Sequence, residues 1–106
     1  MYKVEIIAKY IVNKCIREHH PITNLQLQKI LYGLAEEYRK ENSELFSEKF
    51  DYLPCGPVIL SVFYHYFGYG VMPIDIPEED VLIREEDKNV IDLIVEKKRA
   101  EKPWKI

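Results

Sequence analysis

Hydrophobic residues near the N-terminus recur at steps of three and four positions, with polar residues between them. The repeating positions are Val4, Ile7, Ile11 and Cys15. This period places apolar side chains on one face of a helix, so the pattern predicts an amphipathic helix over about residues 3–18. His19-His20-Pro21 predicts its end, because a residue that precedes proline avoids the α-helical conformation.

The following segment predicts a second amphipathic helix with a clear start. Thr23 is a suitable N-cap, and Gln26 can reach back to form a capping box with it. The apolar stripe that follows at helical spacing consists of Leu27, Ile30, Leu31, Leu34 and Tyr38. We expect this helix to end near Asn42-Ser43.

Residues 51–70, DYLPCGPVILSVFYHYFGYG, have the most unusual pattern in the chain. From Val58 to Phe67 only two polar residues interrupt an apolar and aromatic run. Gly56 suits an N-cap and Pro57 suits the first helical position, so we expect a helix from Pro57 to about Phe67. Because this helix has no polar face, it is predicted to lie at the centre of the domain.

Short extended pieces are predicted on either side of this helix. Phe50 and Tyr52 alternate with charged residues, which is typical of a short strand. Val71–Pro77 contains two prolines among alternating apolar residues, which predicts an extended connection or an edge strand. Val81–Ile83 is predicted as a short second strand.

The last predicted element is a helix from Lys88 to about Glu101, with Asp87 as its N-cap and Pro103 as its stop. Its inward-facing residues are expected to be Val90, Ile91, Ile94 and Val95. The predicted fold is a compact single α+β domain over residues 1–106. It is mostly α-helical, with about four helices around the central apolar helix and a small extended or β element.

Composition favours an ordinary globular protein. Hydrophobic residues make up 47% and charged residues 31% of the 106 positions. No apolar run approaches the roughly 20 residues that a membrane span needs. The N-terminus mixes charged and apolar residues, unlike a signal peptide. We therefore expect a cytoplasmic protein that does not act at a membrane.

The charge is distributed unevenly although its net value is only −3. Residues 1–95 carry ten basic and sixteen acidic side chains, whereas residues 96–106 carry five basic and two acidic ones. Such a basic end can contact an acidic partner or a phosphate backbone. A solvated helix end is the simpler interpretation, because cations suit a helix C-terminus.

Cys55 is the most attractive candidate for a catalytic residue, because a thiol before a helix N-terminus is activated by the helix dipole. His19, His20 and His65 are the candidate bases. No third member of a catalytic set is recognisable, so Cys55 is expected to be an incidental, half-buried thiol. In a reducing compartment neither Cys15 nor Cys55 is expected to form a disulfide, and no enzyme activity is expected.

A metal site is conceivable from Cys15, His19, Cys55 and His65, but these ligands lack the short paired spacings of structural zinc sites. The four glycines are scattered at positions 33, 56, 68 and 70, so no phosphate-binding loop is present. We expect neither a metal ion nor a cofactor.

The aromatic segment is the strongest candidate for a binding surface. The bulky rings are those of Phe63, Tyr64, Tyr66, Phe67 and Tyr69. Tyrosine is common at interfaces because its ring is buried while its hydroxyl stays hydrogen-bonded. A core position explains the same residues equally simply. Both interpretations hold if one side of the helix packs in the core and a flank centred on Tyr64 forms a shallow groove near Gly56-Pro57 and Tyr32.

Two segments together resemble a known family. Residues 22–38, ITNLQLQKILYGLAEEY, and residues 55–70, CGPVILSVFYHYFGYG, are similar to the two motifs of the Panacea antitoxin domain. This family includes phage-associated GepA-like proteins and the SocA-like proteolysis adaptor. Pro103-Trp104 also matches a pair that the family carries near its end. The motif positions are Thr23, Asn24, Leu25, Leu27, Gln28, Lys29, Tyr32, Gly56, Pro57, Val58 and Tyr64.

The resemblance implies a bacterial or prophage antitoxin that neutralises a cognate toxin by direct contact and catalyses no reaction. A SocA-like member would also deliver its toxin to a Clp protease. The alternative function is that of a nucleic-acid-binding phage regulator that uses the basic C-terminal tail. The predicted partner-binding residues are Tyr32, Gly56, Pro57, Val58 and Tyr64. A second copy of the chain is an alternative occupant of the groove, so a homodimer is also considered.

Overall fold

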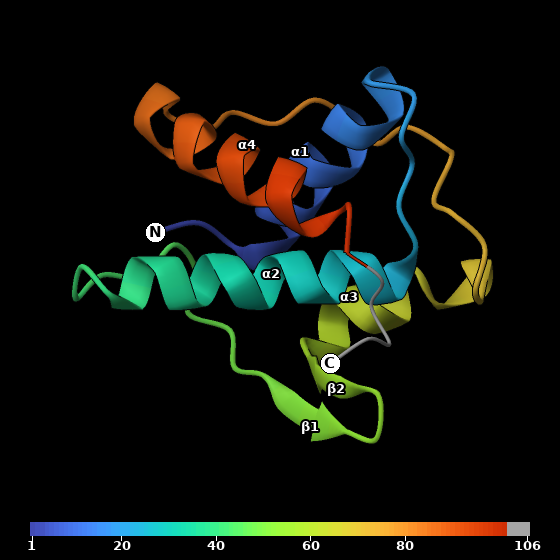
Figure 1. The fold of residues 1–106 in the computed structure, drawn as a ribbon, viewed down its shortest axis with the longest axis horizontal. Coiled ribbons are helices and arrows are strands. Elements are labelled where there is room, and N and C mark those ends of the chain that lie inside the picture. Colours follow the sequence, from blue (N-terminus) through green and yellow to red (C-terminus); the bar gives the residue numbers. More distant parts are fainter. Residues whose placement is uncertain (102–106) are drawn as a thin grey trace.

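The computed structural model describes residues 1–101, which contain four α-helices and one two-stranded antiparallel sheet (Figure 1). The helices are α1 (Val4–Arg17), α2 (Asn24–Arg39), α3 (Leu60–His65) and α4 (Glu85–Lys98). The strands are β1 (Asp51–Leu53) and β2 (Gly56–Val58), and a short 3₁₀ helix, η1, covers Phe67–Tyr69. The predicted mostly helical α+β class is confirmed.

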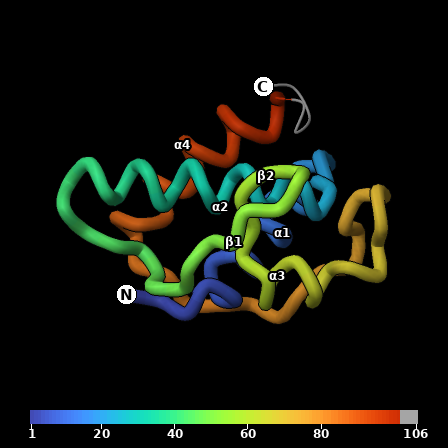
Figure 2. The backbone as a smooth tube through the Cα atoms, turned by 90° about the horizontal axis from the view of Figure 1, so that it is seen from below, coloured from blue at the N-terminus to red at the C-terminus, as the bar shows by residue number. Residues whose placement is uncertain are grey.

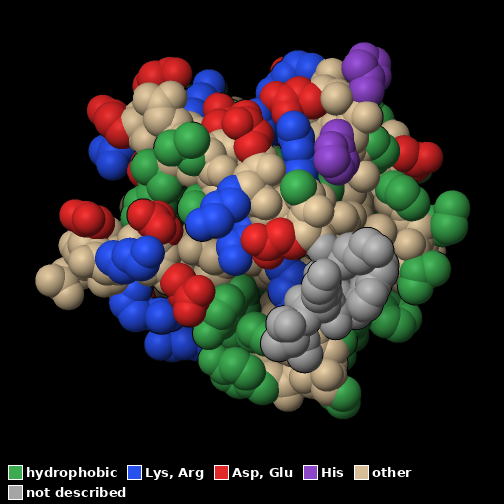
Figure 3. Space-filling view, in the orientation of Figure 1, with side chains coloured by type: hydrophobic (Ala, Val, Ile, Leu, Met, Phe, Trp, Pro, Cys, Tyr) green, Lys and Arg blue, Asp and Glu red, His purple; other side chains and the backbone are tan. Residues whose placement is uncertain are grey.

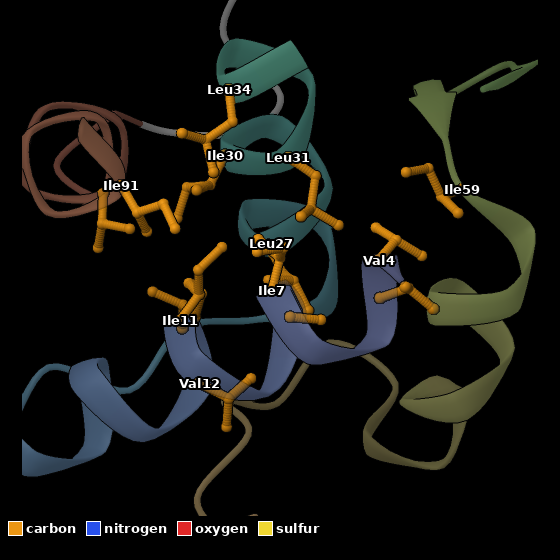
Figure 4. Close-up of a cluster of buried hydrophobic side chains, with 14 of the residues drawn as sticks. Val4, Ile7, Ile11, Val12, Leu27, Ile30, Leu31, Leu34, Ile59 and Ile91 are labelled. Carbon is orange, nitrogen blue, oxygen red and sulfur yellow. The ribbon is translucent and has the colours of Figure 1, made fainter. Parts of the chain in front are cut away.

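Helix α2 is the central element of the domain. It packs against α1 and α4 on one side and against β2 on the other (Figure 1). Apolar side chains from α1, α2 and α4 meet in the core with Ile59 (Figure 4). The segment between η1 and α4 then returns along the outside of the molecule and contacts α1 (Figure 2).

The two predicted N-terminal helices are confirmed, and so is the capping box of the second. The Thr23 hydroxyl accepts a hydrogen bond from the Gln26 backbone N–H at 3.1 Å. The Gln26 side-chain oxygen accepts one from the Thr23 N–H at 2.8 Å. Each residue satisfies a backbone donor that the first helical turn leaves without a partner.

The helix predicted from Pro57 to about Phe67 is shorter at both ends and does not form the centre of the domain. Gly56, Pro57 and Val58 form β2, whose residues pair with Leu53, Tyr52 and Asp51 of β1. Gly56 has a φ of +115°, which glycine adopts freely, so it serves the hairpin rather than a helix cap. The helix begins only at Leu60, and Val62 is its only buried residue. The prediction of a central apolar helix is therefore wrong.

The predicted strand at Val81–Ile83 is also wrong, because these residues are irregular and the second strand is β2. Ile83 is buried and Leu82 is exposed, so buried and exposed side chains alternate here as they would in a strand. The backbone of these residues nevertheless belongs to no strand. Val71–Pro77 is an irregular connection. Ile74 anchors it, because its side chain is buried and its N–H donates to the carbonyl of Ile22 at 2.8 Å.

Helix α4 begins three residues earlier than predicted and ends at Lys98, with Arg84 rather than Asp87 at the N-cap. Asp87 is instead a buried carboxylate in the first turn. It accepts hydrogen bonds from the hydroxyls of Tyr2 at 2.8 Å and Tyr38 at 2.6 Å. Of the four residues expected to face inward, Ile91 and Val95 are buried and Val90 and Ile94 are half-buried. Pro103 lies outside the described residues.

The environment of Asp87 has opposing effects on its pKa. Burial raises the pKa of the carboxyl group, whereas hydrogen bonds from Tyr38 and Tyr2 and the charge of Arg84 lower it. The net pKa is lower than usual. The ionised carboxylate therefore stabilises the attachment of α4 to α2 and the N-terminal segment.

Replacing Thr23 with alanine should destabilise the domain by about 1 kcal/mol, because the N-terminus of α2 loses its cap. For a domain of this size, thermal melts should show a decrease of about 4 °C in Tm. Thr23→Ser is the control, since it keeps the accepting hydroxyl. An unchanged Tm in the alanine variant would contradict the role of the cap.

Asp87→Asn should lower stability at neutral pH by about 1 kcal/mol or more, because charged hydrogen-bonded groups contribute at least this much. A lowered folded-state pKa gives a contribution that is present above the unfolded pKa and is lost as the pH falls through the folded pKa. Urea unfolding at about pH 7 and about pH 3 should therefore show a smaller acid-induced loss in the variant. Equal losses in both proteins would refute this role.

Candidate functional site

The two segments that carry the family resemblance are joined by buried side-chain amides on α2. Asn24 and Gln28 lie one turn apart and are only 4% and 1% exposed. The Gln28 side-chain oxygen accepts a hydrogen bond from the Ile59 N–H at 2.8 Å, and the Asn24 side-chain amide donates to the carbonyl of Phe63 at 2.9 Å. The Gln28 amide also donates to the side-chain oxygen of Asn24 at 3.3 Å.

These bonds hold α3 at both of its ends. Ile59 is the N-cap of α3, and Phe63 belongs to its last turn. The terminal N–H and C=O groups of a helix lack partners within the helix, and two amides of α2 supply them here. The sequence pattern marked Asn24 and Gln28 only as motif positions, and their structural role depends on residues more than thirty positions away in the chain.

The hairpin approaches α2 closely at Gly56. A Cβ atom at this position would lie 2.7 Å from Nζ of Lys29. The end of a lysine side chain can move, so the positive φ of Gly56 is the stronger reason for glycine here. Lys29 and Gly56 come from different motifs, so the hairpin adds a third contact between the two segments.

A cleft of about 330 Å³ lies between the C-terminal half of α2 and the segment of residues 43–52, which leads into the hairpin. Its aromatic lining includes Tyr32, Phe46, Phe50 and Tyr52. The rings of Tyr32 and Phe50 pack edge to face at 5.2 Å. Glu48 also lines the cleft, and its carboxylate accepts a hydrogen bond from the Val4 N–H at the start of α1 at 3.2 Å. The negative charge of Glu36 raises the pKa of Tyr32.

A second aromatic feature, the α3 ring cluster, consists of Phe63, Tyr64 and Phe67. The three ring centroids lie 5.6 to 6.2 Å apart. Tyr64 is 64% and Phe67 60% exposed, so their faces are open to solvent. Val62 and Tyr66, the residue directly after α3, occupy the buried side of this short helix. Tyr64 and Phe67 therefore lie on the side that faces solvent.

The five predicted partner-binding residues lie in different environments. Tyr32 lines the cleft, whereas Tyr64 belongs to the α3 ring cluster. Within residues 1–101 these are two separate features, and not the single groove that was predicted to contain both residues. Gly56 and Pro57 are half-buried in β2. Val58 is 1% exposed and packs inside the domain. Tyr64 has the most exposed side chain of the five residues.

The predicted environment of Cys55 is wrong. It is exposed in the turn between β1 and β2, five residues before α3 begins, whereas Cys15 is buried in α1. Burial raises the pKa of the Cys15 thiol, although the guanidinium of Arg99 acts in the opposite direction. Nε2 of His65 lies 3.1 Å from a carboxylate oxygen of Glu78. Within residues 1–101, no group of three or more potential ligands could hold a metal ion.

The basic C-terminal part of the chain is described as far as residue 101. An open cleft of about 500 Å³ between α2 and α4 is lined by Arg39, Lys40, Lys97 and Lys98. Acidic residues of α2 line it as well, so its charge is mixed. Residues 102–106, with the Pro103-Trp104 pair of the family resemblance, lie outside the described residues.

The charge around the aromatic segment is not evident from the hydrophobic pattern of the chain. Residues 50–83 contain five acidic residues and no Lys or Arg, so all 15 basic residues lie outside them. This segment includes the α3 ring cluster and the loop after it. Counting charges along the sequence shows this signal, since residues 75–92 alone carry eight acidic residues.

Comparison with known proteins gives no relative for the chain. It matches no protein-family model, no curated protein and no solved structure. No helix in the described part of the chain is long and apolar enough to cross a membrane. The family resemblance therefore stays a prediction that depends on the motif residues alone.

Gln28→Leu should destabilise the domain by about 1–3 kcal/mol, because the buried N–H of Ile59 loses its acceptor. Hydrogen exchange should accelerate most in α3, and urea unfolding should report the loss of stability. Glu36→Leu is the matched control, since it introduces the same side chain at an exposed position of α2. Equal stability of the Gln28 variant and the wild type would exclude the proposed attachment of α3.

Proposed function

We propose that this chain is a protein-binding antitoxin that neutralises a cognate toxin by direct contact in the bacterial cytoplasm. The observation that carries the proposal is the resemblance of two separate segments, in order and at matching spacing, to the motifs of the Panacea antitoxin domain. The proposal assigns no catalytic step and no cofactor to the chain. Delivery of the toxin to a Clp protease is a further possibility within the same function.

The contacts between the two segments support this proposal. Asn24, Gln28 and Lys29 of the first segment meet Phe63, Ile59 and Gly56 of the second, respectively. A pattern whose polar members satisfy buried backbone groups specifies a scaffold. The similarity is then one of fold, and the exposed side chains on that scaffold are free to determine which toxin is bound.

The α3 ring cluster is the best candidate for the toxin contact. Aromatic residues are enriched at protein interfaces, and exposed apolar side chains that lie together mark interaction sites more often than isolated ones do. Tyr64 and Phe67 satisfy both conditions, because they are exposed and in mutual contact. Their replacement should affect binding more than folding.

Co-expression tests the function directly. The product of the gene beside this one should arrest growth when it is expressed alone, and co-expression of this chain should restore growth. The two proteins should also co-purify as a complex. Growth arrest that persists despite production of folded chain would refute the antitoxin proposal.

Tyr64→Ala should leave Tm nearly unchanged, because the side chain is mostly exposed. It should weaken toxin binding by roughly thirtyfold, the effect of losing about 2 kcal/mol at an interface centre. Thermal melts and calorimetric titration measure the two effects separately. Cys55→Ser is the control and should change neither. A large decrease in Tm, or unchanged Tm with unchanged affinity, would contradict the assignment of Tyr64.

A further inference from the structure

The exposed apolar side chains are concentrated in one segment. Of the nine large hydrophobic residues exposed in residues 1–101, five lie between positions 64 and 76. These five are named the α3–η1 surface and are Tyr64, Phe67, Val71, Met72 and Ile76. Figure 3 shows hydrophobic side chains gathered along the edge of the molecule where η1 and the following loop lie.

The surface is held in place by buried anchors beneath it. Tyr66 is 3% exposed, and its hydroxyl donates a hydrogen bond to Glu78 at 2.8 Å. Ile74 is buried, and its N–H is bonded to the carbonyl of Ile22. Because these two residues take the inward positions, their neighbours in the chain face solvent. A surface fixed in this way loses little conformational entropy on binding.

The charge beside this surface is negative. Asp75, Glu78, Glu79 and Asp80 lie at its C-terminal end, and no Lys or Arg occurs anywhere from position 50 to position 83. Lys9 of α1 pairs with Glu79 at 2.8 Å. Within residues 1–101, Asp75 and Asp80 form no ion pair. The apolar surface therefore has an acidic border whose charge is only partly compensated.

This border decides between the possible occupants. In a two-fold dimer both copies present the same patch, so Asp75 and Asp80 would be brought into an interface whose segment 50–83 offers no Lys or Arg to pair with them. An anionic membrane surface would be repelled as well. A segment with an apolar stripe flanked by Lys or Arg would instead cover the exposed apolar side chains and pair with the acidic border. Complementary charge also accelerates association.

We infer that the α3–η1 surface binds a cationic amphipathic segment of a partner protein. The inference deepens the proposed function, since the partner would be the toxin and the segment its contact with this chain. Apolar side chains of the segment cover Tyr64, Phe67 and Met72, and its basic residues lie against Asp75 and Asp80. Apolar burial provides most of the affinity, and the charges determine orientation and selectivity.

Calorimetric titration of the full chain with two synthetic helical peptides tests the inference. Both peptides carry the same leucine stripe over about four turns, and their polar faces carry either lysine or glutamate. The lysine peptide should bind at least about tenfold more tightly than the glutamate peptide. Its affinity should decrease as salt is added, because ions screen the acidic border.

Two variants and one control locate the binding. The double variant Phe67→Ser/Met72→Ser should weaken lysine-peptide binding about tenfold or more, with an unchanged Tm. Asp75→Lys/Asp80→Lys should remove the preference for the lysine peptide. Leu93→Ser is the matched control, because Leu93 is 70% exposed on α4 and lies outside the surface.

Equal binding of both peptides, or equal weakening by Leu93→Ser, would overturn the inference. Self-association of the free chain that Phe67→Ser/Met72→Ser abolishes would assign the surface to a second copy and overturn it too. The co-expression experiment tests the antitoxin role separately. Neutralisation that survives both surface variants would refute this surface while leaving the antitoxin proposal standing.

Discussion

The position of the exposed aromatic surface depends on one buried interaction, the hydrogen bond from the Ile59 N–H to the side chain of Gln28. A helix of six residues has too few internal hydrogen bonds to be stable alone in water. Gln28 and Asn24 attach its two ends to α2, which is itself stabilised by a capping box and an apolar stripe. The orientation of α3, and with it the exposure of Tyr64, follows from this attachment.

The two motifs of the family resemblance contain residues of two kinds. Asn24, Gln28 and Val58 are buried and maintain the fold, whereas Tyr64 is exposed and available to a partner. A motif of this kind contains more information about architecture than about the identity of a partner. The chemistry of the partner is better read from what surrounds the scaffold, namely exposed apolar side chains beside an acidic border.

Local signals allowed accurate prediction of α1, α2 and the capping box, because a cap and an apolar period involve residues only a few positions apart. The same reasoning misplaced Gly56 and Asp87. Each suits a helix start locally, yet tertiary contacts assign them other roles. Gly56 adopts a positive φ in a hairpin against α2, and Asp87 accepts hydrogen bonds from two tyrosines distant in the chain.

The sequence by itself determined the mostly helical class, the two N-terminal helices, the aromatic character of residues 63–69 and the absence of Lys and Arg from positions 50–83. The tertiary structure decided which aromatic residues are buried and which partners satisfy the buried polar groups. The physical reason is that an all-apolar segment has no polar face to indicate its orientation. Packing against α1, together with the hydrogen bonds from α2, directs Val62 and Tyr66 inward and leaves Tyr64 and Phe67 in solvent.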